Sequence, residues 1–249
     1  MARRKLTDTS HPDTTLTDSY WLTWGDEPQP HMRQKIIYLT FEEVSKIGPG
    51  AFGVSNVCDR LGITYPMVNH YFGGRDQLLA EGAYLAYVRY VTSLWEAVDA
   101  APRKPVARLE AWMRAQINWT RQWSGWGALL NYPVASLQVS EIMDRNFRDE
   151  MQRYFEWNLA GLAVLVNDVL TDSVTDERPS LDNSDRTDLL ANTELVYLTS
   201  SVAFCTLGAS VWNAGQHLPS AKIQVAVDMA PEQVEQHIQR VIRMLQTKI

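Results

Sequence analysis

The chain has only 2 cysteines in 249 residues, Cys58 and Cys205, and they lie in separate apolar stretches. Two isolated thiols cannot build the disulfide framework of a small secreted protein, so we interpret both as core residues. The basic start, residues 1–5, is followed by Thr, Asp, Ser and Pro rather than by the apolar run of a signal peptide. We therefore expect a cytoplasmic protein with a flexible arm over residues 1–30.

Catalytic and metal-binding motifs are also scarce. The 5 histidines are dispersed and show neither i, i+4 pairing nor cysteine partners of metal-site type; they are His11, His31, His70, His217 and His237. The chain contains no G-x-S-x-G nucleophile elbow. We therefore predict no enzymatic activity, no metal site and no cofactor.

One motif imitates a phosphate-binding loop. Residues 48–53, GPGAFG, satisfy the pattern G-x-G-x-x-G. The dinucleotide-binding form of this motif follows a strand, whereas the residues before Gly48 have helical periodicity. The kinase form needs further motifs that this chain lacks. We therefore interpret these glycines as a turn between helices.

Positive charge is not in excess. The chain carries 23 basic and 29 acidic side chains, a formal net charge of −6. Residues 31–80 are nearly neutral at +1, with Arg33, Lys35, Lys46, Arg60 and Arg75 against Glu42, Glu43, Asp59 and Asp76. Near-neutral charge over residues 31–80 does not exclude nucleic-acid binding. A dimer doubles the number of phosphate contacts, and the N-termini of helices supply further contacts.

Residues 195–221 contain no Asp, Glu, Lys or Arg, which is long enough to raise the question of a membrane span. Ser, Thr, Asn and Gln side chains dilute the hydrophobicity of this stretch, so we reject a membrane partner. We expect a helix buried from both sides. Gly208 and Ala209 would let a second helix approach closely, as at the seam of a symmetric homodimer.

The most informative pattern begins at residue 31. Apolar residues at helical spacing predict a helix over 31–47, which residues 48–50 end with Gly, Pro and Gly. A second helix fits 53–61 and ends at Gly62, and a third spans about 65–71. Thr64 is placed to cap the third helix through its hydroxyl group. Two short helices joined by a glycine turn are typical of a helix-turn-helix DNA-binding motif.

The third helix has a clear outward face. Val68 and Phe72 are spaced to pack inward, and the outward set is Tyr65, Met67, Asn69, His70 and Tyr71. Over about 50 residues, this part of the chain resembles the tetracycline-repressor (TetR) family. The residues that carry the resemblance include Val68 and Phe72 together with Gly48, Val57-Cys58, Leu61-Gly62-Ile63-Thr64, Pro66, Arg75 and Leu78-Leu79.

That resemblance implies an all-α homodimer with an N-terminal DNA-binding domain and a C-terminal ligand-binding and dimerisation domain. We expect the boundaries 31–80 and 81–249. The resemblance also implies DNA contacts, which we assign to Ser55, Thr64, Tyr65, Pro66, Met67, Asn69, His70, Tyr71 and Arg75. Asn69 stands where the family usually has Tyr, and Gly53 where Ser or Thr often caps the second helix.

Four tryptophans recur at spacings of seven, four and three residues, and Gln116 lies on or beside their face; they are Trp112, Trp119, Trp123 and Trp126. Aromatic residues at helical spacing usually form core. The alternative is the wall of a ligand cavity, since such cavities are concave and largely apolar. Both interpretations stay open at this stage.

The remaining chain predicts more helix. Apolar residues over 142–169 indicate one long helix or two abutting ones, followed by an acidic loop over 171–188. Residues 223–229 read as an extended connector, and Pro231 starts a last helix with Val234, Ile238, Val241 and Leu245 inward. We therefore expect a repressor released from an inverted-repeat operator by a small apolar or aromatic effector. The alternative is an α-helical enzyme or small-molecule-binding protein whose N-terminal motif no longer binds DNA.

Overall fold

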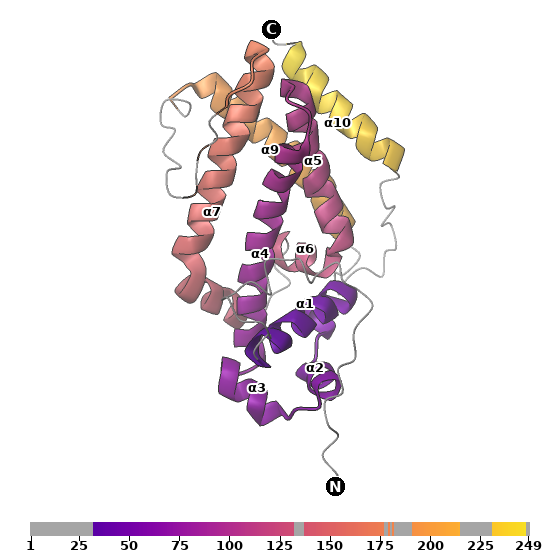
Figure 1. The fold of residues 1–249 in the computed structure, drawn as a ribbon, viewed down its shortest axis with the longest axis vertical. Helices are drawn as coiled ribbons and strands as arrows, with labels where there is room; N and C mark the ends of the chain where they lie inside the picture. Colours follow the sequence, from indigo (N-terminus) through magenta and orange to yellow (C-terminus); the bar gives the residue numbers. More distant parts are fainter. Residues whose placement is uncertain are drawn as a thin grey trace.

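A computed structural model describes residues 32–131, 137–176, 179, 181, 191–214 and 231–247, and the described residues form helices and no strand. The helices are α1 (Met32–Ala51), α2 (Val54–Leu61), α3 (Tyr65–Phe72), α4 (Arg75–Ala100), α5 (Pro105–Gln122), α6 (Ser124–Asn131), α7 (Leu137–Thr171), α9 (Thr193–Ala214) and α10 (Pro231–Gln246). The predicted all-α fold is confirmed. Figure 1 shows α1–α3 at one end of an elongated molecule and α5, α7, α9 and α10 grouped at the other.

Helix α1 continues past its predicted end. The predicted inward residues are buried; they are Ile36, Ile37, Thr40, Phe41 and Val44. Gly48 adopts φ 75° and ψ 163°, which breaks the helix as expected, but Pro49 then opens one more turn that runs to Ala51. Proline is compatible with the first position of a new turn, where its missing N–H is not needed. The motif 48–53 is thus a kinked helix end.

Helices α2 and α3 match their predicted positions. Gly62 lies between them with φ 64°, and its N–H donates to Asp59 O while the N–H of Ile63 donates to Cys58 O at 3.0 Å. This left-handed C-cap reverses the chain within three residues. Thr64 occupies the N-cap position of α3, but its hydroxyl group makes no capping bond. That part of the prediction is wrong, and the N–H of Met67 bonds to the backbone oxygen of Thr64 instead.

Helix α4 joins the two ends of the molecule. It runs without interruption through the predicted domain boundary at 80/81 and packs against α1, α5, α6 and α7. Two hydrophobic cores lie along it. The lower core combines α1–α3 with Trp119, Trp126 and Val139, and the upper core combines α5, α7, α9 and α10. Tyr90 contacts both cores, so it marks the seam between them.

The upper helices settle two open points. Residues 142–169 belong to the single helix α7, and α10 buries the four predicted residues at its inner face. Helix α9 differs from expectation, because Tyr197 is 61% and Phe204 71% exposed. It is buried on one side only, against α5, α6, α7 and α10. The expected connector 223–229 and most of the expected loop 171–188 lie outside the described residues.

Over Thr193–Val211, α9 has the length and apolarity of a membrane-spanning helix. Core helices of soluble proteins share these properties, and 39% of this segment is buried inside the protein. The segment is therefore weak evidence for a membrane.

Candidate nucleic-acid interface and interior site

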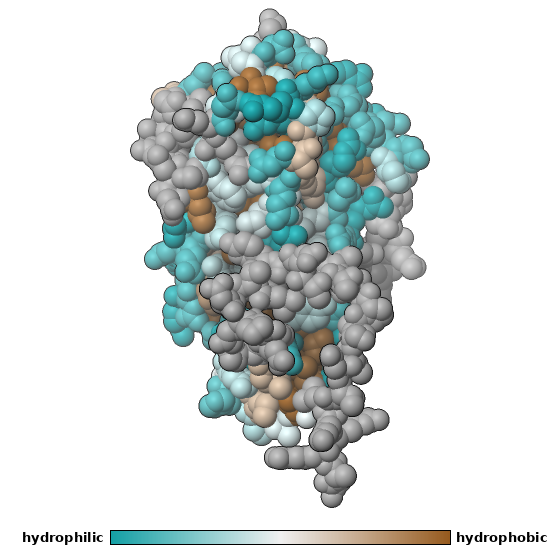
Figure 2. All heavy atoms as spheres, viewed as in Figure 1, coloured by the Kyte–Doolittle hydropathy of each residue, from teal (hydrophilic) through white to brown (hydrophobic). Residues whose placement is uncertain are grey.

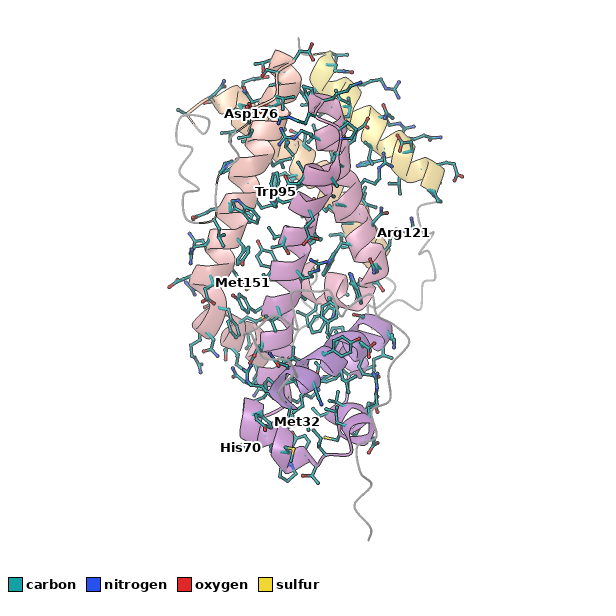
Figure 3. The ribbon with its side chains drawn as sticks, viewed as in Figure 1. Met32, His70, Trp95, Arg121, Met151 and Asp176 are labelled. Carbon is teal, nitrogen blue, oxygen red and sulfur yellow. The ribbon has the colours of Figure 1, made fainter. Side chains whose placement is uncertain are left out.

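Helix α3 presents a neutral polar and aromatic surface. Tyr65, Met67 and Tyr71 are 48%, 39% and 37% exposed, whereas Val68 and Phe72 are buried at 0% and 4%. Asn69 and His70 are exposed beside them. Figure 3 places His70 at the end of the molecule that carries α2 and α3. The predicted division of α3 into an inward and an outward face is confirmed.

The remaining predicted contact residues also reach the surface. Ser55 at the start of α2 and Thr64 and Pro66 at the start of α3 are exposed. The rings of His70 and Tyr71 lie edge to face, with centroids 5.3 Å apart. In the view of Figure 2 this end shows mostly pale and brown residues among the grey ones. A surface of this kind suits base edges better than a row of phosphates.

Arg75 is bound within the protein. Its Nε donates to Phe52 O at 3.1 Å, one terminal nitrogen donates to Pro49 O at 2.9 Å, and the other pairs with Asp76 at 3.1 Å. These bonds fix the start of α4 against the end of α1. The predicted phosphate contact by Arg75 stays a prediction, and the guanidinium group would make it in addition to these bonds.

Two other arginines of the region are paired as well. Arg60 lies 2.6 Å from Glu42 and 3.0 Å from Glu43, which bridges α2 to α1. Arg33 lies 2.5 Å from Glu81 and sits 4.8 Å from the centre of the Phe72 ring. The sequence shows that these charged residues are present, but it does not show that the arginines and the glutamates form ion pairs with each other.

The tryptophan stripe divides between two places. Trp112 is 2% exposed in the upper core and donates to Asn158 Oδ1 at 3.2 Å. Trp126 is fully buried against α1, where its indole donates to Phe41 O at 2.9 Å, and the Trp123 ring lies 4.9 Å from that of Phe41. The helix break at Trp123, between α5 and α6, separates the last indole from the first two.

Between these indoles, the interior contains polar atoms without partners. Gln116 Oε1, Trp119 Nε1 and Thr199 Oγ1 belong to residues that are 3%, 5% and 2% exposed, and none of these atoms has a hydrogen-bond partner. Buried polar groups are normally paired, so each such atom calls for an explanation, which includes a ligand or an ordered water. Gln116 and Trp119 lie one turn apart on α5, and α9 with Thr199 packs against α5.

Two tyrosines of α4 adjoin this group. The Tyr90 ring lies 5.0 Å from that of Trp119 and 6.3 Å from that of Tyr87. Desolvation of the phenol groups raises the pKa of both tyrosines well above the ordinary value of 10.0, so both stay neutral. Tyr87, Tyr90 and Thr199 were missed in the sequence. Their polarity is visible there, but their placement beside α5 depends on the packing of distant helices.

Among the described residues, no group of three or more His, Cys, Asp and Glu side chains could hold a metal ion. The outward face of α3 and the unpaired polar atoms around Gln116 are two features of the described residues that have the chemistry of a binding site. The first defines a helix-turn-helix module at one end of an all-α protein. The second lies in the helical body to which that module is joined.

Comparisons with known proteins agree with this class. A scan against protein-family models finds no match. The HTH-type transcriptional regulator BetI 1 of Chromohalobacter salexigens is 29% identical over 83 residues, which are 33% of this chain and 38% of the relative. The match therefore spans well under half of that regulator.

Solved structures share the fold over most of the chain. A protein of unknown function from Rhodococcus sp. RHA1 gives a TM-score of 0.56 at 14% identity, covering 90% of this chain and 98% of that one. A candidate transcriptional regulator from Pseudomonas aeruginosa PAO1 gives 0.50 at 17%, covering 86% and 90%. A TetR/AcrR-family regulator from Thermobifida fusca YX-ER1 gives 0.49 at 17%, covering 86% and 95%. At these identities the likeness to the first two structures shows a shared fold and nothing more specific.

Proposed function

We propose that the protein is a homodimeric DNA-binding regulator of transcription whose affinity for its operator falls when a small molecule binds the helical body. The observation that carries this proposal is the outward face of α3. Its exposed aromatic and polar side chains rest on the buried Val68 and Phe72, and the Gly62 turn sets α3 against α2. This is the geometry that places a second helix in a major groove.

The roles of the surface residues follow from their positions. Residues on the first turn of α3, Tyr65, Pro66 and Met67, approach base edges, while Asn69, His70 and Tyr71 lie over bases and the flanking backbone. Ser55 and Thr64 stand at helix N-termini, where hydroxyl groups and backbone N–H groups meet phosphates. Arg75 contributes a further phosphate contact from the start of α4.

The effector site is the group of unpaired polar atoms at the seam of the two cores. Gln116 and Trp119 line it from α5, Tyr87 and Tyr90 from α4, and Thr199 from α9. An effector that carries both hydrogen-bond donors and acceptors on an apolar or aromatic body would satisfy these atoms, which is the usual composition of a small-molecule site. Trp112, Trp123 and Trp126 then form the packed surroundings.

Helix α6 connects this site to the DNA-binding end. The N–H of Trp123, where α5 ends, bonds to Trp119 O at 2.8 Å, and Trp126 on α6 bonds to Phe41 O of α1. A shift of Trp119 would therefore move α6 against α1 and change the position of α3. The dimer would have two conformations, and in one of them the two α3 helices are not spaced to fit the operator. The effector lowers the affinity for DNA by no more than the ratio of its own affinities for these two conformations.

The exposed side of α9 supplies the dimer seam. Tyr197, Phe204 and Gly208 face outward without a charged side chain between them, and nothing lies within 4 Å of a methyl group placed on Gly208. An uncharged apolar helix face of this kind suits a second copy of the same helix.

The experiment is capture of genomic DNA fragments by the purified full-length protein, followed by sequencing and footprinting. We expect an inverted repeat with half-sites about 10 base pairs apart or somewhat more. A reporter gene placed behind the captured site decides between repression and activation. Enrichment of no fragment would overturn the proposal and favour the alternative, a small-molecule-binding protein or enzyme with an inactive motif.

A further inference from the structure

The outward face of α3, all of whose residues the structure describes, carries no guanidinium or ammonium group. Arg and Lys read guanine through its O6 and N7 atoms, and this is the commonest specific base contact in the major groove. Helix α3 contains neither residue. Arg145 of α7 lines the same surface hollow as Tyr65, whereas the nearby arginines of α1, α2 and α4 are held by carboxylates or backbone oxygens: Arg60 by Glu42 and Glu43, Arg33 by Glu81, and Arg75 by Phe52, Pro49 and Asp76. A bidentate contact to guanine would break these bonds.

The side chains that α3 does expose fit another base pair. Asn69 can donate to N7 and accept from the N6 amino group of adenine, which is the characteristic bidentate contact of asparagine. Met67 and Tyr65 are 39% and 48% exposed, and their apolar surfaces match the 5-methyl group of thymine.

His70 does not alter this preference. Its ring lies edge to face against Tyr71, which fixes the direction of the imidazole. One imidazole N–H donates to a purine N7, and adenine and guanine share that acceptor. His70 therefore selects a purine without distinguishing between the two.

We propose that the bases under α3 in each half-site are A·T pairs, read in the major groove by Asn69 on adenine and by Met67 and Tyr65 on thymine methyl groups. This inference rests on the proposed function and narrows it to a class of operator. The reading would be largely uncharged, so base discrimination would persist at salt concentrations that weaken phosphate contacts.

The first test modifies the captured operator one base at a time. Replacing thymine by uracil removes only the methyl group, which lies in the major groove, so a minor-groove preference for A·T would not respond. Each contacted methyl group should contribute about 4-fold in affinity, the equivalent of roughly 0.8 kcal/mol per buried carbon. Uracil at flanking positions outside the footprint is the matched control and should change nothing.

The second test assigns the adenine contact. Asn69→Ala should reduce discrimination against the other three pairs at one position per half-site by roughly 5- to 150-fold, the range of a good bidentate contact. Asn146→Ala, an exposed asparagine on α7, is the control variant and should bind like the parent. Circular dichroism of both variants verifies that they fold.

The possible outcomes distinguish a failure of this inference from a failure of the proposed function on which it rests. The inference would be overturned if G·C pairs lay under α3, or if operators with uracil were bound as tightly as operators with thymine. Either result would leave the proposed function, a DNA-binding regulator, unaffected. Loss of affinity without relaxed base preference in Asn69→Ala would also overturn the adenine assignment. Absence of binding to any DNA would overturn both.

Discussion

At the scale of single residues, the protein interior contains polar side-chain groups that are surrounded by apolar side chains. Tyr90 contacts both cores, and desolvation keeps its phenol group neutral well above the ordinary pKa of 10.0. Trp112 and Trp119 lie on the same helix, yet only the indole of Trp112 has a hydrogen-bond partner. Such pairs allow the effect of a hydrogen bond to be separated from that of packing.

The raised pKa of Tyr90 predicts alkaline destabilisation. Above pH 10 the phenol group ionises in the unfolded chain but keeps its proton in the folded protein, so the stabilisation present below pH 10 is lost as the pH rises towards the folded pKa. Each such group contributes up to about 1.4 kcal/mol per pH unit. Melting temperatures of the parent and Tyr90→Phe between pH 8 and 11 measure this, and the variant should lose less stability. Parallel curves would contradict the prediction.

The two indoles predict different costs for the same change. Trp112→Phe removes a donor and leaves Asn158 Oδ1 without its partner, so the free energy of unfolding should fall by about 1–3 kcal/mol more than in Trp119→Phe. If Trp119 lines the effector site, Trp119→Phe should alter the response to effector and spare operator binding. Urea unfolding beside a DNA titration tests this. Equal loss of stability and DNA binding in both variants would favour core packing at both positions.

At the scale of elements, α6 packs on α1 and also on α5 and α9 of the helical body. Gly125 lies so close to α1 that a Cβ atom there would be 1.7 Å from the backbone oxygen of Val44. Trp126, one residue further, fills the space between Phe41 and Gly82. The close approach of α6 to α1 thus depends on Gly125, which has no side chain.

Gly125→Ala should therefore separate α6 from α1. Backbone atoms cannot yield as a flexible side chain can, so we expect a loss of about 1–3 kcal/mol or more in unfolding free energy, together with weaker operator binding. Gly50→Ala is the matched control, because nothing lies within 4 Å of a Cβ atom there. Thermal melting and a binding titration of both variants test the contact. A Gly125→Ala protein that melts with its parent would show that the helices are farther apart.

At the scale of the whole molecule, an apolar surface on α9 stays uncovered in a single chain. Helix α9 exposes Phe204 and Tyr197 on its outer side, and its described segment lacks charge after Glu194. Two reading helices must also be held at a fixed spacing to bind an inverted repeat. A dimer through α9 would account for both.

Phe204→Asp should accordingly shift the protein towards monomer, because a carboxylate would be buried without a partner at the seam. Operator affinity should fall with it, since each half-site would then bind alone. Phe155→Asp, at a 55% exposed position on α7, is the control. Sedimentation velocity at micromolar concentration tests the assembly. Dimers that persist in Phe204→Asp would place the seam elsewhere.

The sequence by itself determined the local features. Gly48 fixes where α1 kinks and Gly62 fixes where α2 ends, because glycine adopts a positive φ without steric cost whatever its neighbours are. Helical spacing separated Val68 and Phe72 from the outward residues of α3. Those signals place the proposed DNA-contact residues on one exposed helix face, and the signals are contained in a few consecutive turns of chain.

Tertiary structure decided everything that depends on residues far apart in the chain. Whether Trp126 lines a cavity or packs on α1 depends on the approach of residues 41 and 126, and whether Arg60 is free depends on Glu42 and Glu43 across a helix pair. The unpaired atoms of Gln116, Trp119 and Thr199 likewise exist only because α5 and α9 exclude water from them. Helical periodicity specifies which face of a helix is buried, but not which other helix covers it.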